Sequence, residues 1–226
     1  YEKETLAAQA VLLRSSLVKA YAEEEMKNGV KELAADDGLY SYWSDARMRT
    51  RWGKQYEQSL DKCLDAVIET QGIYLTWNGE AIKGYYHGMS AGGTRNGKEL
   101  SDGESYGYLK KADCPENLSA SDYLTEYRVS IKQLGELTEA EQNTEGYVLS
   151  VCKNGIRISG EKLREELGLS STNFTWKEED GDYIFSIRGR GHGFGLDQYY
   201  ANVLAQNGMT YREIVDYFFA DTDYQR

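Results

Sequence analysis

The sequence contains very little proline, histidine and cysteine. Its 226 residues include one proline, two histidines and three cysteines. Cys63, Cys114 and Cys152 lie far apart and form no CxxC or Cys/His spacing, so they do not predict a structural metal site. A sparse, odd number of cysteines is compatible with the cytosol and with the outside of a Gram-positive cell. Cysteine usage therefore leaves the compartment open.

Long apolar runs and basic runs are absent as well. No stretch approaches the roughly 18 apolar residues of a membrane helix, and the opening residues YEKETLAAQAVLL do not have the form of a signal peptide. Because they open directly inside a helical pattern, we expect an upstream secretion signal or anchor that this chain does not include. Acidic residues number 37 against 26 basic ones, a net charge of -11, which argues against a nucleic-acid partner.

Two segments near the start carry apolar residues at helical spacing, which predicts amphipathic helices with these residues on the core side. The first set is Leu6, Ala10, Leu13, Leu17 and Tyr21, and the second is Tyr56, Leu60, Cys63, Leu64, Val67 and Ile68. Alternating residues over 73–85 around Asn78-Gly79 then predict a β-hairpin with a type I′ turn.

The rest of the chain mixes short strands with short helices. Residues 94–125 are polar and loop-like, and residues 127–188 predict several strands with turns at 154–155 and 180–181. Helices are expected at 159–167, at about 196–206, and after a capping box formed by Thr210 and Glu213. We therefore predict a single mixed α+β domain over residues 1–226, a helical core with β-hairpins and a β-rich insertion at about 95–185.

Three stretches invite a functional interpretation. Glu4 begins an otherwise Ala/Leu-rich helix, although an acidic residue there is also a common response to the helix dipole. Small residues fill YYHGMSAGGTRNG, residues 85–97, and glycines surround His192 in IRGRGHGFGLDQYYANVLAQNG, residues 187–208. Such loops either turn the chain or let a ligand approach the backbone closely. Each stretch alone is a weak signal.

Together and in this order, the three stretches resemble the stage II sporulation protein D family of peptidoglycan lytic transglycosylases. ETLAAQAVLLRS is similar to the family motif EALKAQAVAART, GMSAGGT to STSGGxT, and GRGHGFGLDQ to GxGxGHGVGMSQ. With a similar tail, the resemblance extends from Glu4 to about Thr222, although residues 95–185 contribute little to it. The matched positions are Glu4, Leu6, Ala8, Gln9, Ala10, Val11, Arg14, Ser90, Gly92, Gly93, Thr94, Gly189, Gly191, His192, Gly193, Gly195 and Gln198.

The resemblance implies cleavage of peptidoglycan glycan strands between N-acetylmuramic acid and N-acetylglucosamine, with a 1,6-anhydro ring closing on the muramic acid. It assigns Glu4 as the catalytic group, first an acid and then a base, so no second carboxylate is needed. To begin protonated, Glu4 needs apolar surroundings that outweigh the helix N-terminus. We therefore expect a partly dehydrated Glu4 in a groove between the two glycine-rich loops.

Further residues are carried over as glycan contacts: His192, Gly193, Ser90, Gly92, Gly93, Thr94, Gln198, Gln9 and Arg14. The glycines would let a sugar chain pass close to the backbone, and the imidazole would bond substrate or orient Glu4. Alternative interpretations stay open: His192 as a structural turn residue, Gln198 as a solvated helix residue, and Arg14 as part of a structural salt link. His87 either lines the groove or is structural. Asp197 stands where the family has a small Ser, as a substrate-tuning change or a surface accident.

No cofactor or metal is expected, because residues 35–52 have neither Cys nor His where some family members hold zinc. The resemblance also implies an extracytoplasmic protein with an N-terminal membrane anchor, working with an amidase and a membrane scaffold during engulfment in sporulation. Two other functions remain as alternatives. One is a non-catalytic glycan-binding domain, and the other is a phosphate-binding module that uses GRGHGFG with Arg188 and Arg190 as an anion loop.

Overall fold

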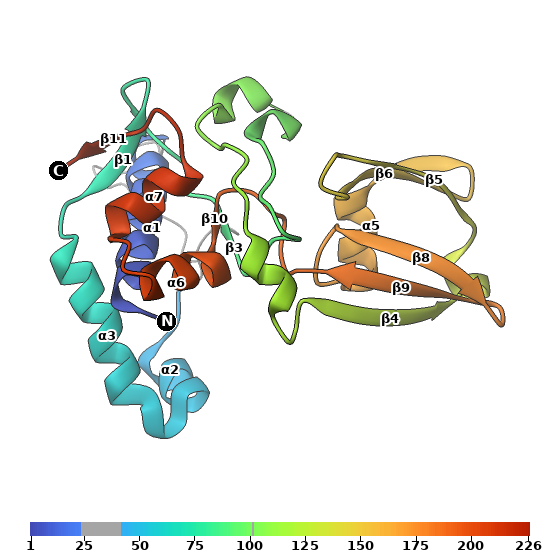
Figure 1. Ribbon diagram of the computed structural model, residues 1–226, viewed down its shortest axis with the longest axis horizontal. Coiled ribbons are helices and arrows are strands. Elements are labelled where there is room, and N and C mark those ends of the chain that lie inside the picture. Colours follow the sequence, from blue (N-terminus) through green and yellow to red (C-terminus); the bar gives the residue numbers. More distant parts are fainter. Residues whose placement is uncertain (24–41, 101) are drawn as a thin grey trace, which may run out of the picture. The chain divides into compact units, whose positions relative to one another are not determined.

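The computed structural model describes residues 1–23, 42–100 and 102–226. These residues form two compact units, one comprising residues 1–85 and 201–226 and the other residues 86–200. We call them the terminal unit and the central unit. Each unit combines helices with small sheets (Figure 1), which confirms the predicted α+β fold class.

The terminal unit is built around its first helix, which contacts α3, α7 and β1 (Figure 1). Its helices are α1 (Lys3–Glu23), α2 (Asp45–Trp52), α3 (Tyr56–Glu69), α7 (Tyr211–Phe218) and the part of α6 (Gln198–Gln206) from residue 201 onward. Strand β1 (Tyr74–Trp77) pairs antiparallel with β2 (Glu80–Ala81) and with β11 (Asp223–Gln225). No helix in the described parts of the chain is long and apolar enough to span a membrane.

Small residues, and not the predicted leucine stripe, form the buried face of α1. The buried positions are Thr5, Ala7, Ala8, Val11, Leu12, Ser15 and Ser16. By contrast, Leu17 and Tyr21 are 40% and 53% exposed. The prediction of a core helix was therefore right about the helix and wrong about the face that packs inward.

Close approach of the hairpin to α1 explains this inversion. Ser15 Oγ accepts the N–H of Leu75 at 2.8 Å, and Ser16 Oγ accepts the N–H of Gly84 at 2.9 Å. A Cβ atom at Gly84 would lie only 2.4 Å from the carbonyl oxygen of Leu12. Larger side chains on this face of α1 would push the hairpin away and leave these buried backbone groups without partners.

Helix α3 likewise forms where predicted but packs differently. Only Tyr56 and Ala66 are buried in it, whereas Leu64, Val67 and Ile68 are exposed. Helical spacing thus identified the helix; its assignment to the core was right for Tyr56 and wrong for Leu64, Val67 and Ile68.

The local turn and capping signals agree with the structure. Asn78 and Gly79 have φ of 51° and 84°, as a type I′ turn requires. Ser159 Oγ accepts the N–H of Lys162 at the start of a helix over residues 160–167. Thr210 and Glu213 form the predicted capping box of α7. These elements follow from short sequence windows, because their partners lie within a few residues.

The central unit contains two three-stranded antiparallel sheets and one short parallel pair. The first sheet has the order β4-β9-β8 and the second β5-β6-β7, and β3 (Tyr86–His87) pairs parallel with β10 (Leu196–Asp197). Their bounds are β4 Leu124–Ser130, β5 Leu137–Gln142, β6 Val148–Lys153, β7 Ile156–Ser159, β8 Phe174–Glu179 and β9 Asp182–Arg188. The helices are α4 Ile131–Leu134 and α5 Gly160–Leu167, with 3-10 turns at Gly97–Glu99, Gly103–Tyr106 and Pro115–Ser119.

The main apolar core of the central unit joins residues from both of its three-stranded sheets. Its buried members are Val129, Leu134, Leu137, Val148, Val151, Leu163, Leu169, Phe174, Tyr183, Phe185 and Ile187. The strands predicted over residues 127–188 are thus present and supply a core of their own. Their description as an insertion in one catalytic domain stays a prediction.

Candidate functional site

The second and third motif loops lie against each other in the central unit. Met89 and Arg190 exchange two backbone hydrogen bonds, of 3.0 and 2.7 Å, and the Arg95 N–H donates to the carbonyl of Gly193 at 2.8 Å. The two glycine-bearing loops therefore converge as predicted. Glu4 belongs to the terminal unit, so its convergence with these loops stays a prediction.

The glycines of the third motif are required by contacts within the chain. Gly191 and Gly193 have φ of 101° and 81°, where glycine is strongly favoured. A Cβ atom at Gly191 would lie 2.7 Å from Cβ of His87, and one at Gly193 would lie 2.8 Å from the ring of Tyr147. At these two positions the space next to the glycine is filled by neighbouring residues of the same unit, and the predicted contact of Gly193 with glycan stays a prediction.

Gly193→Ala is expected to destabilise the protein by at least about 2 kcal/mol. Positive φ alone costs a residue with a side chain roughly 1–2 kcal/mol, and the added methyl group must also displace the buried Tyr147 ring. Gly181→Ala is a suitable control, because Gly181 has a similar φ of 81° but no neighbour within 4 Å of the added atom. Urea unfolding should show the larger loss at Gly193, and equal losses would contradict the packing argument.

Asp197 is the centre of a buried polar network that joins the two loops. Its side chain is fully buried, and its carboxylate accepts the N–H of Ser90 at 2.7 Å and the N–H of Tyr200 at 2.9 Å. The amide of Asn117 donates to the same carboxylate and also to the carbonyl and the hydroxyl of Ser90. The interpretation of Asp197 as a surface accident is therefore wrong: it caps α6 and fixes the second loop from beneath.

His87 and His192 lie next to this network with their ring centroids 5.7 Å apart. His87 Nδ1 lies 3.1 Å from the carbonyl of Phe194, so this nitrogen carries the hydrogen. His192 Nδ1 accepts the N–H of Phe194 at 3.0 Å, and the His192 ring also bonds to the backbone of Tyr86. Burial lowers the pKa of His87, and burial, with His87 and two nearby arginines, lowers the pKa of His192 to about 3. Both rings are therefore neutral near pH 7.

These contacts bear on the open interpretations of both histidines. His87 is buried and bonded within the unit, which agrees with its structural interpretation. His192 contributes a fixed, uncharged ring, so any contact that it makes with a glycan does not involve a cationic imidazole. Its predicted roles toward substrate and Glu4 stay predictions.

We expect the neutral His192 to make stability depend on pH between neutral and acidic conditions. In the unfolded chain its pKa returns to about 6.5, whereas in the folded chain it is about 3. The unfolded state therefore binds more protons below pH 6.5, so this contribution is complete above pH 6.5 and is lost progressively as pH falls toward 3. About 2 kcal/mol should be lost between pH 7 and pH 5.

Urea unfolding at the two pH values checks this expectation, and His192→Gln should show a smaller loss over the same interval. NMR titration of the wild-type ring gives a second measurement. A His192 ring that titrates near pH 6.5 in the folded protein would contradict the argument.

The side chains of the second motif point into the unit. Ser90 and Thr94 are both fully buried, and Thr94 Oγ1 donates to the carbonyl of Lys110 and accepts the N–H of Ala112. The carbonyl of Gly92 accepts the N–H of Cys114, and Gly93 forms a bridge with Asp113. These bonds give the loop a fixed conformation, while contacts of Ser90, Gly92, Gly93 and Thr94 with a glycan stay predictions.

Glu4 lies in the first turn of α1, and its carboxyl group contacts the start of α7. The side chain is half-buried, and Oε2 accepts the N–H of Tyr211, the first residue of α7, at 2.6 Å. Within the described residues, no hydrogen bond involves the other oxygen, Oε1. The carboxyl is thus oriented through one oxygen by the first residue of α7.

Three further predicted contacts have different surroundings. Arg14 Nη1 donates to the carbonyls of Thr70 and Ile73, both at 2.7 Å, so within the described residues its partners include backbone oxygens and no carboxylate is among them. Gln9 is half-buried on α1, and Gln198 is half-buried at the first position of α6. Their contacts with a glycan stay predictions.

Comparison with known proteins finds relatives that match nearly the whole chain. Stage II sporulation protein D of Bacillus subtilis (strain 168) is 30% identical to it over 236 residues, covering 98% of this chain and 68% of that protein. Stage II sporulation protein D of Bacillus amyloliquefaciens is 30% identical over 237 residues, covering 99% and 69%. The chain belongs to the stage II sporulation protein D family. No family model matches it.

In this member of the stage II sporulation protein D family, several residues outside the matched motifs bond the two glycine-bearing loops. Asn117 bonds Ser90 and Asp197, and the Tyr147 hydroxyl bonds the N–H of Ala91 and the carbonyl of Gly93. Arg95 Nη1 donates to the carbonyl of His192 at 3.3 Å. Only Arg95 had a sequence signal, because it directly follows the second motif. Asn117 and Tyr147 belong to the stretch with little family resemblance.

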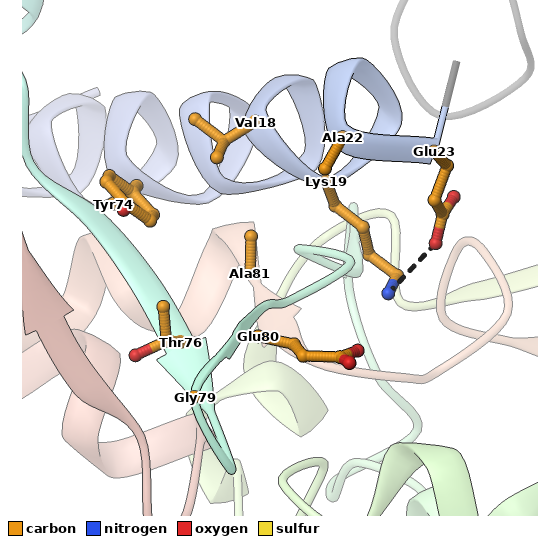
Figure 2. A pocket seen from close by; sticks show the side chains of 9 residues that line it. All are labelled: Val18, Lys19, Ala22, Glu23, Tyr74, Thr76, Gly79, Glu80 and Ala81. Atoms are coloured by element: carbon orange, nitrogen blue, oxygen red, sulfur yellow. Dashed lines mark ion pairs between the residues drawn. The ribbon is translucent and has the colours of Figure 1, made fainter. Parts of the chain in front are cut away.

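Two hollows in this family member are lined by residues other than the predicted catalytic Glu4. In the terminal unit, a hollow of about 430 Å³ lies between the end of α1 and the hairpin (Figure 2), with a Lys19–Glu23 ion pair of 3.0 Å at its rim. In the central unit, an open groove of about 690 Å³ includes Phe194 of the third motif and Arg95. This second groove borders the His192 loop through Phe194.

Several observations on the described residues concern metal and phosphate binding. Among the described residues, no group of three or more His, Cys, Asp and Glu side chains could hold a metal ion. Of the segment predicted to lack zinc ligands, residues 35–41 lie outside the described residues. The N-terminus of α6 is already occupied by the Asp197 carboxylate, and Arg190 pairs with Asp122 at 2.6 Å, so neither offers an open position to an anion.

Proposed function

We propose that the chain is a peptidoglycan lytic transglycosylase that acts in sporulation. It cleaves the bond between N-acetylmuramic acid and N-acetylglucosamine in glycan strands and leaves 1,6-anhydro ends. Family membership supports the sporulation role, because the curated relatives are named for it. The observation that carries the activity is the Glu4 carboxyl, held by Tyr211 through one oxygen and without a hydrogen-bond partner for the other among the described residues.

In this mechanism one carboxyl group transfers a proton twice. Protonated Oε1 of Glu4 donates its proton to the glycosidic oxygen, and the bond from that oxygen to the anomeric carbon breaks. The resulting carboxylate accepts the proton of the C6 hydroxyl as O6 attacks the anomeric carbon. Glu4 is then protonated again, and no water is consumed. The Tyr211 N–H keeps the carboxyl in one orientation through both transfers.

The central unit supplies two fixed loops and two neutral imidazole rings in this proposal. Its two motif loops are fixed by Asp197, and both histidines are neutral near pH 7. A glycan without stem peptides presents a lactyl carboxylate on each muramic acid and many hydroxyl and acetamido groups, and the latter bond well to backbone groups and amides. Gln198, Gln9 and the half-exposed backbone around Gly92 are therefore the proposed contacts with sugar.

We place this activity outside the cytoplasmic membrane, with an N-terminal anchor and with an amidase and a membrane scaffold as partners. An amidase would supply the substrate, because removing stem peptides gives denuded strands. These elements of the proposal follow from the family resemblance of the three motifs.

The proposal is tested on purified glycan strands, with and without stem peptides, incubated with the chain and analysed by mass spectrometry. We expect ends that are lighter by one water molecule than hydrolysed ends, as intramolecular ring closure requires. Ordinary reducing ends would indicate a hydrolase instead. If neither appears while strands still bind, the chain is a glycan-binding domain.

A further inference from the structure

The residue before α1 is bonded by a side chain two hundred positions later. The N–H of Glu2 donates to Asn202 Oδ1 at 2.6 Å, and Thr5 Oγ1 in the first turn lies 3.4 Å from the same oxygen. The N–H of the residue before a helix has no partner within the helix, so a side-chain acceptor there fixes the start of the helix. Asn202 lies on α6, in the same compact unit as α1.

We propose that Asn202 is the residue that positions Glu4, by bonding the residue before α1 and a residue of its first turn, one on each side of Glu4 along the chain. This inference rests on the proposed function of Glu4 as the acid. The contacts made by Asn202 are to residues 2 and 5, which flank Glu4 along the chain. Thr5 is buried, so the turn is fixed at a packed position rather than at a fraying end.

The chemistry of the donors fixes which way the Asn202 amide faces. A backbone N–H can only donate, so the atom next to Glu2 must be the amide oxygen, Oδ1. The side chain at position 202 must therefore accept a hydrogen bond, and an aspartate of the same shape can also do this. A carboxylate is further favoured there by the positive end of the α1 dipole. Asn202→Asp is thus the conservative replacement, and Asn202→Ala removes the acceptor.

Two contacts then fix Glu4, one acting on its backbone and one on its side chain, and both come from residues 202–211. Asn202 fixes the backbone of its turn, and the Tyr211 N–H fixes its side chain at 2.6 Å. The Thr210–Glu213 capping box sets the direction of that N–H by starting α7 at Tyr211. Losing the backbone hold should let Glu4 move while the side-chain hold remains.

The test compares Asn202→Ala with Asn202→Asp and with Ser44→Ala, which removes the helix cap of α2 in the terminal unit. With denuded glycan strands as substrate, we expect Asn202→Ala to lower kcat about tenfold or more with KM nearly unchanged, because small displacements of a catalytic group have large rate effects. Asn202→Asp should recover most of kcat, and Ser44→Ala should leave kcat unchanged. An Asn202→Ala variant with wild-type kcat, or an equal loss in Ser44→Ala, would overturn the proposal.

A second measurement keeps this inference separate from the proposed function. Hydrogen exchange of the Glu2 amide and the carboxyl carbon resonance of Glu4 report the position of the turn without any substrate. We expect Asn202→Ala to speed the exchange and shift the resonance, and Asn202→Asp to restore both. If the wild-type chain forms no product but these signals behave as stated, the activity fails and the positioning stands. If they do not change in Asn202→Ala, the positioning fails.

Discussion

Glu4→Gln should lower the formation of 1,6-anhydro ends by about 10³-fold while the fold and glycan binding are retained. Acid-base groups contribute roughly 10²–10⁴-fold, and glutamine cannot donate a proton to the leaving oxygen or take one from the C6 hydroxyl. Its amide oxygen can still accept the Tyr211 N–H, so the contact between α1 and α7 is preserved. The measurement is product release from denuded strands by mass spectrometry, together with binding of the same strands.

Glu2→Gln is the matched control for this experiment. Glu2 is an exposed acid two residues away, and it bonds Asn202 through its backbone rather than its side chain. The control should therefore keep full activity. Retained activity in Glu4→Gln would refute the assignment of Glu4 as acid. A wild-type chain that binds strands and releases nothing would favour the non-catalytic glycan-binding alternative.

Asp197→Ala should destabilise the protein by about 4 kcal/mol, the largest loss of stability that we expect from one substitution. The change takes from the N–H of Ser90 and the N–H of Tyr200 the acceptor that they have inside the unit, and the amide of Asn117 keeps only its bonds to Ser90. Each buried donor that loses its partner costs about 1–3 kcal/mol. It also removes the cap of α6, so both the second loop and the following helix should loosen. Thermal and urea unfolding measure the loss.

Two variants separate the network from the mere loss of charge. Asp197→Asn keeps an acceptor oxygen at the same distance, so it should retain part of the stability. Asp61→Ala removes an exposed aspartate of α3 and should have an effect within about 0.5 kcal/mol. An Asp197→Ala protein as stable as the Asp61→Ala protein would show that the network does not hold the loops together.

The sequence predicted those features whose physical causes are short-range. Turns at Asn78-Gly79 and the capping box of Thr210 and Glu213 depend on residues within a few positions, and both are present. The motif order also located the loops around Ser90 and His192, which bond each other through Met89, Arg95 and their partners. Motif matching succeeded for these loops because each is a continuous segment with required glycines.

Features that depend on contacts between residues far apart in the sequence could not be predicted from local patterns. The leucine stripe of α1 suggested its core face, yet the hairpin approaches so closely that Ala7, Ala8, Ser15 and Ser16 are buried instead. Asp197 resembled a substituted surface position, because its donors come from residues 90 and 117. Asn202 and Tyr211 gave no signal for Glu4, since nothing in a local window relates residue 4 to residue 211.

The assembly of the terminal unit from residues 1–85 and 201–226 has a consequence for the order of synthesis. Glu4 is synthesised 207 residues before Tyr211, whose N–H orients its carboxyl group, and Asn202 also follows it by nearly the whole of that interval. Under the proposed mechanism, a nascent chain that ends before Asn202 would therefore carry the acid without the groups that orient it.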